Sequence, residues 1–89
     1  MNIDYQELNL SALPHIESIV REMFPQGKKS GREWKIGSLS GESGTSMSIN
    51  LQTGLWSDFA TGDKGDILGL VSQARNVPLN DAAEWLAAR

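Results

Sequence analysis

Apolar residues recur at helical spacing near the start of the chain. They are Leu10, Leu13, Ile16, Ile19, Val20, Met23 and Phe24. Positions three or four residues apart line one face of an α-helix, so the pattern predicts a first helix over residues 11–24. Ser11 is a suitable N-cap, and Pro25 cannot continue the helix. Residues 25–33 are rich in turn formers and cations, and a basic loop is expected there.

From Trp34 onward the apolar period changes to two, which is typical of β-strands. The alternating positions are Trp34 and Ile36, then Met47, Ile49 and Leu51, then Leu55, Ser57 and Phe59 opposite to Trp56 and Asp58. This pattern predicts three short antiparallel strands. The Gly/Ser-rich loop SGESGTS and a tight turn at residues 52–54 join them.

Two further helices are expected after the strands. Asp66 can cap the first of them, which carries an apolar run from Ile67, and Asn76 is suited to its C-terminal cap. Pro78 opens the last helix. The order of one helix, a three-stranded sheet and two helices predicts a small α+β fold. We expect a single domain over residues 1–89, with an N-terminal extension at 1–27 and a sheet module at 32–88.

The composition of the chain excludes several classes of protein. The chain has 89 residues, 39% of them hydrophobic, a net charge of −3 and no cysteine. A disulfide framework and a thiolate zinc site are therefore excluded. The apolar runs are too short to span a bilayer and the N-terminus is acidic, so a cytoplasmic location without membrane contact is expected. Charge is uneven, because residues 28–35 carry four cations against the single carboxylate of Glu33.

Few residues are suited to catalysis. His15 is the only strong base at neutral pH, but a lone histidine in an apolar helix is more often structural. Asp58, Asp63 and Asp66 could form a carboxylate pair, although nothing in a hydrophilic turn raises a carboxylate pKa. We therefore expect a non-catalytic chain.

The turn Gly62–Gly65 precedes a helix, where phosphate-binding loops occur. Asp63 and Asp66 flank it and would repel an anion, and the P-loop spacing is absent. The same carboxylates could hold Mg²⁺ or Ca²⁺, but the spacing of a calcium loop is missing. A glycine turn followed by an Asp cap accounts for these residues without a metal or a cofactor.

Nucleic acid is the remaining ligand class. Lys28, Lys29, Arg32 and Lys35 could contact phosphates, and Trp34 and Trp56, on strands that could be neighbours, could stack bases. The alternative is that both tryptophans fill the core and the cations only solvate a loop. Composition alone leaves these two interpretations open. The first requires an exposed Trp34 or Trp56 beside the cations.

The order of residues resembles a known family. The segment WSDFATGDKGDILGLV, Trp56–Val71, resembles part of the N-terminal zinc-binding domain of bacterial and bacteriophage DNA primases. Thr45–Ile49 resembles a strand of that domain, and Leu79–Ala87 resembles its terminal helix. The resemblance covers residues 32–88. The two cysteines of the segment fall on Asp58 and Thr61, and the other ligand pair falls within residues 36–40, which lack both Cys and His.

The resemblance thus implies a zinc-ribbon-like sheet without its metal. It also implies a module that binds or positions single-stranded DNA for a plasmid, prophage or phage primase or primase-helicase. A Toprim or helicase domain of the same protein would carry the chemistry. The alternative is a protein-interaction module that docks a replication partner. The predicted nucleic-acid-binding residues are Lys28, Lys29, Arg32, Trp34, Lys35, Trp56 and Lys64.

Overall fold

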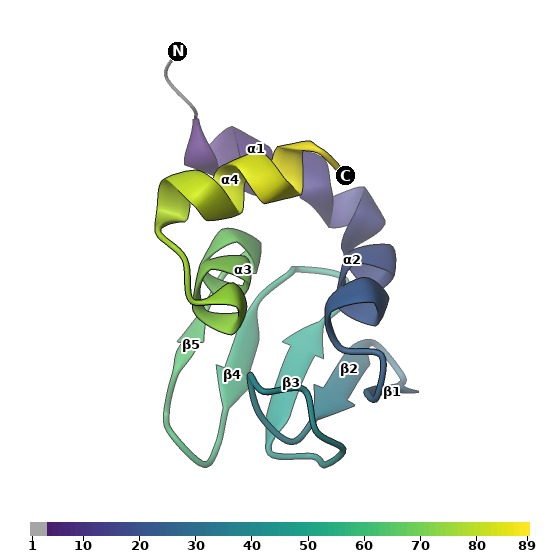
Figure 1. Cartoon of the computed structure of the whole chain (residues 1–89). Coiled ribbons are helices and arrows are strands. Elements are labelled where there is room, and N and C mark those ends of the chain that lie inside the picture. The colour runs from purple at the N-terminus through teal and green to yellow at the C-terminus, as the bar shows by residue number, and fades with distance from the viewer. Residues whose placement is uncertain (1–3) are drawn as a thin grey trace.

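The computed structural model describes residues 4–89 and has an α+β fold (Figure 1). In chain order its elements are helix α1 (Tyr5–Ala12), the 3₁₀ turn η1 (Leu13–His15), α2 (Ile16–Met23), strands β1 (Lys28–Ser30), β2 (Glu33–Ile36), β3 (Met47–Asn50), β4 (Trp56–Asp58) and β5 (Lys64–Gly65), and helices α3 (Ile67–Arg75) and α4 (Leu79–Ala87).

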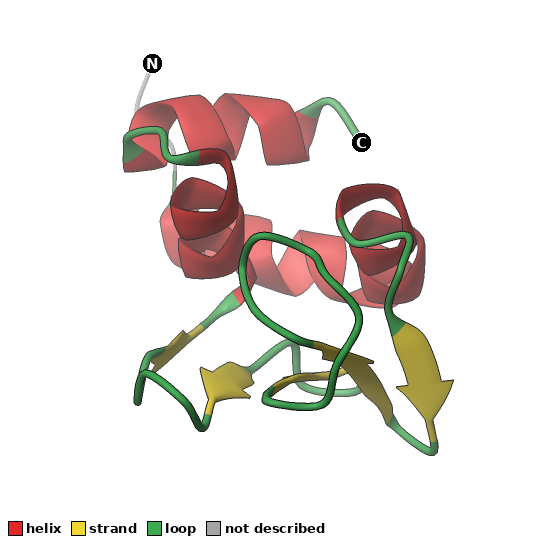
Figure 2. Ribbon diagram, turned by 60° about the horizontal axis from the view of Figure 1, so that its bottom comes forward, coloured by secondary structure: helices red, strands yellow, loops and turns green. Residues whose placement is uncertain are grey.

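The five strands form one antiparallel meander in the order β1-β2-β3-β4-β5. The helices lie on one side of this sheet and leave its other side open (Figure 2). Successive side chains of a strand point to opposite faces. Trp34, Ile49 and Trp56 are register partners on the inner face, which the helices cover.

The core lies between the helices and the inner face of the sheet. Its buried side chains come from every helical segment except η1 and from the three central strands, and the largest fully buried ones are Phe24, Ile36, Met47, Ile49, Ile67 and Leu70. Asn9 fastens α1 to the start of α3, because its amide donates to the Asp66 carboxylate and accepts from the Leu68 N–H. Residues from Ala12 to Leu86 thus share one core.

The first helix begins earlier than predicted and is interrupted. Asp4, rather than Ser11, is its N-cap, and the Asp4 carboxylate accepts from the Glu7 N–H. The 3₁₀ turn around Pro14 separates α1 from α2, because proline has no N–H to continue the α-helical hydrogen bonds. The helix end at Met23, just before Pro25, agrees with the prediction.

The sheet has two more strands than predicted. The region 25–33, expected to be a loop, contains β1, and the glycine turn leads into β5. Both are edge strands of two or three residues, and so short a segment cannot show an alternating pattern in the sequence. The three central strands and both C-terminal helices confirm the prediction. So do the caps: Asp66 accepts from the Gly69 N–H at 2.8 Å, and Asn76 has a left-handed φ of 54°.

Candidate nucleic-acid interface

A row of five residues crosses the open face of the sheet, one from each strand. Register pairs join Lys28 to Lys35, Lys35 to Ser48, Ser48 to Ser57, and Ser57 to Lys64. Lys35 lies between the buried Trp34 and Ile36 and therefore points away from the helices. We call Lys28, Lys35 and Lys64 the lysine row. With strands about 4.8 Å apart, the row extends over roughly 19 Å.

The lysine row is accessible. Lys28 and Lys64 are exposed and Lys35 is half-buried. Glu33 is a carboxylate next to the row, with Oε2 3.8 Å from the Lys35 Nζ, and it also accepts a hydrogen bond from the Ser48 hydroxyl. A partly exposed ion pair at this distance contributes little free energy, so Lys35 can exchange Glu33 for another anion.

Two large apolar side chains flank the row on the same face. Leu55 and Phe59 lie two residues before and after Ser57, and their exposed fractions are 58% and 79%. The backbone ladder continues to both positions: the Asn50 N–H donates to the Leu55 carbonyl, and the Phe59 N–H donates to the Ser46 carbonyl. Alternation therefore puts Leu55, Ser57 and Phe59 on the open face.

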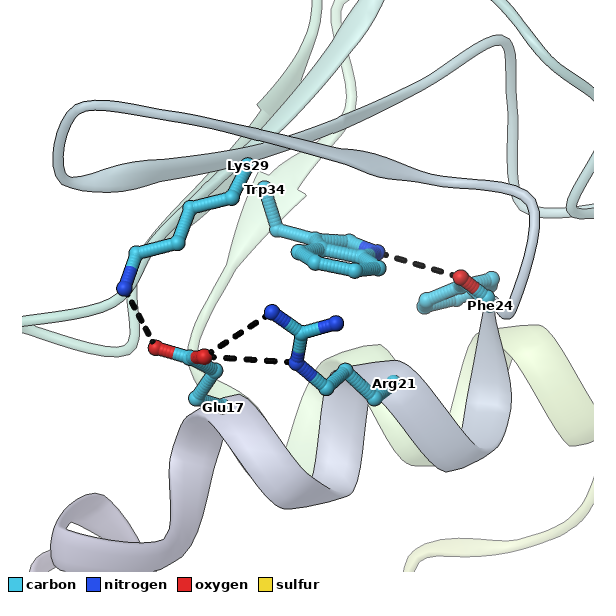
Figure 3. Close-up of polar contacts among 5 residues, drawn as sticks. All are labelled: Glu17, Arg21, Phe24, Lys29 and Trp34. Carbon is cyan, nitrogen blue, oxygen red and sulfur yellow. Dashed lines mark hydrogen bonds and ion pairs between the residues drawn. The ribbon is translucent and has the colours of Figure 1, made fainter.

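The strand tryptophans are not part of this face, and the expectation of an exposed Trp34 or Trp56 is wrong. Both are 3% exposed. The Trp34 indole N–H donates to the Phe24 carbonyl at 3.1 Å, and the Arg21 guanidinium lies 4.7 Å from the Trp34 ring centroid (Figure 3). The Trp56 indole N–H donates to the Asp66 carbonyl at 2.9 Å. A sheet covered on one side must bury its inner row, and these aromatics fill it.

Two of the predicted cations lie away from the lysine row. The Lys29 Nζ is 2.9 Å from Glu17 Oε1, on the helical side of the edge strand, where Arg21 also contacts Glu17 (Figure 3). Hydrogen bonds from Lys29 and then Arg21 lower the pKa of Glu17 below 4.5. Arg32 lies at the β1–β2 turn and donates to the Gln52 side-chain carbonyl at 3.3 Å. The basic island of the sequence is therefore divided in the fold.

The sequence prediction included Lys64 but did not include Leu55, Phe59, Ser48 or Ser57 as site residues. A signal for three of them was present, because the third strand pattern placed Leu55, Ser57 and Phe59 opposite to Trp56. Once Trp56 points into the core, the opposite set has to point to the other face of the sheet.

The glycine turn is held by its own carboxylates. Asp58 is 3% exposed, and its Oδ1 accepts from the N–H of Ala60 at 2.8 Å and of Thr61 at 3.4 Å. At the following helix, Asp66 and Asn9 accept from the N–H groups of Gly69 and Leu68. Two first-turn donors that an anion would need are thus already engaged.

Among residues 4–89, the structure brings together neither a metal site nor a catalytic site around His15. Within residues 4–89 no three His, Cys, Asp or Glu side chains are grouped so as to hold a metal ion. His15 is exposed and borders a hollow of about 170 Å³ between the N-terminal helices and α4, together with Leu8, Ile19 and Leu86. The hollow is lined mainly by apolar residues, and no carboxylate borders it to orient the imidazole.

No protein-family model, curated protein or solved structure matches this chain. The likeness to primase zinc-binding domains therefore remains a prediction from the sequence segments that carry it. Across the described part of the chain, no helix is long and apolar enough to cross a membrane.

Proposed function

We propose that this chain is a non-catalytic DNA-binding module that holds single-stranded DNA on the open face of its sheet, as a template-positioning part of a primase or primase-helicase. The lysine row carries this proposal. Three cations from three strands lie in one register row on a face that the helices leave open. Lysines on an open surface contact the phosphates of a strand without reading its bases.

The replication context rests on the resemblance of Trp56–Val71 to primase domains. The Asp58 turn is compatible with it: one buried carboxylate accepts the two backbone N–H groups that follow it. In the resemblance, Asp58 takes the place of one of the two cysteines of that segment. A Toprim or helicase coding region in the same open reading frame would support the primase assignment, and an unrelated neighbouring domain would remove it.

Salt-dependent binding tests the lysine row. Fluorescence anisotropy of a labelled oligothymidylate of about 12 nucleotides is measured at increasing salt. For single strands the slope of log K against log salt is about −0.7 per neutralised phosphate, so three lysines predict a slope of about −2. Lys35→Gln and Lys64→Gln should each make the slope less steep by about 0.7.

Lys29→Gln is the matched control, because Lys29 is an exposed lysine that pairs with Glu17 rather than joining the row. It should leave the slope unchanged. Absence of binding by the wild type at about 50 mM salt, or an equal loss in Lys29→Gln and Lys64→Gln, would contradict the proposal. Intrinsic tryptophan fluorescence is a poor reporter here, because Trp34 and Trp56 are buried.

The second candidate function is docking of a replication protein through the helices. It is favoured by the burial of both strand tryptophans together with the exposure of Leu79 on α4, at 45%, and of Leu10 on α1, at 65%. Trp85 is half-buried between neighbours that include the Arg89 guanidinium, 3.8 Å from its ring centroid. Loss of binding to a purified polymerase or helicase in Leu79→Asp, with retention in Lys64→Gln, would favour this function.

A further inference from the structure

The exposed apolar residues of this chain are divided between its two sides. Four large apolar side chains are exposed among residues 4–89, namely Leu10, Leu55, Phe59 and Leu79. Leu10 and Leu79 belong to helices, whereas Leu55 and Phe59 bracket β4 on the open face of the sheet. Phe59, at 79%, is the most exposed of the four and the only aromatic one. Phe59 is therefore free to contact a ligand on the open face.

A hollow lies beside Leu55. It has a volume of about 380 Å³ and is lined by Leu55, Trp56, Lys64 and Gly65. Trp56 and Gly65 are register partners, and the Trp56 ring is directed into the core. The hollow is therefore floored by backbone and walled by the outward side chains of Leu55 and Lys64. An apolar side chain beside an ammonium group suits a nucleotide, because its base can pack against the apolar side chain and its phosphate can pair with the ammonium group.

The spacing along β4 completes the geometry. Outward residues on one strand are about 6.7 Å apart, so Leu55 and Phe59 are separated by roughly 13 Å, with Ser57 midway. Ser57 is small and has a hydroxyl donor. Lys64 lies one strand away on one side and Lys35 two strands away on the other, both in the register row of Ser57.

We propose that Phe59 is a base-stacking platform, that Leu55 packs against the face of a second base, and that the strand segment between the two bases crosses Ser57, where Lys64 and Lys35 contact its phosphates. This inference rests on the proposed function, and it adds that the ligand must have unpaired bases. Aromatic side chains stack on any base, so binding is expected to be tolerant of sequence. A duplex hides its base faces and retains only the phosphate contacts.

The test separates stacking from phosphate binding. Affinities for oligothymidylate and for an abasic strand of the same length are measured by anisotropy at fixed salt. Phe59→Ala should weaken binding of oligothymidylate by at least about fivefold, which is the lower end for loss of a base–aromatic stack. The abasic strand should bind wild type and Phe59→Ala equally. Leu10→Ala is the matched control, as an exposed apolar residue on a helix, and should bind like the wild type.

A second variant tests stacking without removing the aromatic ring. Phe59→Trp retains a stacking ring and should bind at least as tightly as the wild type. It also puts a fluorophore on the open face, whose emission should be quenched by oligothymidylate but not by the abasic strand. Because residue 59 is exposed, both variants should fold, which far-UV circular dichroism and thermal unfolding would verify.

The outcomes distinguish this inference from the proposed function. If Phe59→Ala binds oligothymidylate like the wild type while Lys64→Gln binds more weakly, the stacking inference is overturned and the phosphate-binding function stands. If the wild type binds neither strand, both are overturned. If Phe59→Ala abolishes binding of a protein partner but not of DNA, the platform is a protein contact and the stacking inference is likewise wrong.

Discussion

The packing of Trp34 against Gly27 offers a strict test of the fold that supports the lysine row. A Cβ atom added at Gly27 would lie 2.0 Å from the Trp34 Nε1, 2.6 Å from its Cε2 and 2.7 Å from the Ile36 Cγ2. All of these atoms belong to buried side chains on the inner face. Gly27→Ala must therefore displace the indole, and with it the β1–β2 pairing that places Lys28 beside Lys35.

The expected loss in the free energy of unfolding follows from the contacts that the Trp34 indole would lose. Overpacking a core typically costs about 1–3 kcal/mol. Displacement also breaks the 3.1 Å hydrogen bond to the Phe24 carbonyl, worth about 1 kcal/mol. We expect Gly27→Ala to lower the free energy of unfolding by about 3 kcal/mol. For a domain of this size the midpoint of thermal unfolding should then fall by roughly 12–24 °C.

The assay is thermal and urea unfolding of four variants. Gly65→Ala is the matched control, because its added Cβ would lie 3.2 Å from the Nε1 of the other strand tryptophan, Trp56. It should cost less than about 1 kcal/mol, since a few tenths of an ångström suffice to accommodate it. In a Trp34→Phe background the cost of Gly27→Ala should shrink by about 1–2 kcal/mol, because the overlapping Nε1 is gone. Equal stability of Gly27→Ala and wild type would refute the reasoning.

Two further predictions concern carboxylates. The pKa of Glu17 is held low first by the Lys29 hydrogen bond and then by Arg21. Its stabilising contribution is therefore present above the unfolded value of 4.5 and lost as pH falls through the lower folded pKa. In Lys29→Gln the pKa of Glu17 should rise toward 4.5, as carboxyl NMR titration would measure; an unchanged titration would contradict the assigned cause. Asp58→Ala should cost about 2–3 kcal/mol in urea unfolding, because two backbone N–H groups lose a charged acceptor. Asp58→Asn keeps a side-chain oxygen as acceptor and should cost about half as much or less, and equal losses would show that the side-chain acceptor is not what stabilises the turn.

The sequence predicted the central elements because their signals are local. The inward sets of β2, β3 and β4 alternate within each strand, and Asp66 and Asn76 act within one helix. The start of α1 was missed because Asp4 stands before a segment with little apolar periodicity, and its first turn is fixed by the Asp4 cap and by the packing of Tyr5 and Leu8 against the core. The edge strands β1 and β5 exist only through their pairing partners, which no local pattern records.

The candidate site was predicted only in part for the same reason. Charge along the chain grouped Lys28, Lys29, Arg32 and Lys35, whereas strand register groups Lys28 and Lys35 with the distant Lys64. Alternation sends Lys29 to the helical side, where Glu17 pairs with it. The tryptophans were ambiguous by composition, and the position of the helices, a tertiary feature, decided that they are buried.

The net charge of −3 does not oppose DNA binding on the open face, because the charges are separated in space. The helical segments, residues 4–23 and 66–89, carry seven carboxylates against three arginines, whereas residues 24–65 carry five cations against four carboxylates. The molecule extends over 39 × 23 × 20 Å, and the Debye length at 0.15 M salt is only about 8 Å. A strand on the open face is then largely screened from the acidic helices.

The same separation predicts how binding changes when that screening is removed. At about 0.01 M salt the Debye length is about 30 Å, comparable with the dimensions of the molecule, and the helical carboxylates then repel the bound strand. The plot of log K against log salt should therefore follow its slope of about −2 between roughly 50 and 200 mM and flatten below that range. A plot that stays linear to about 10 mM would place the bound strand elsewhere than on the face opposite the helices.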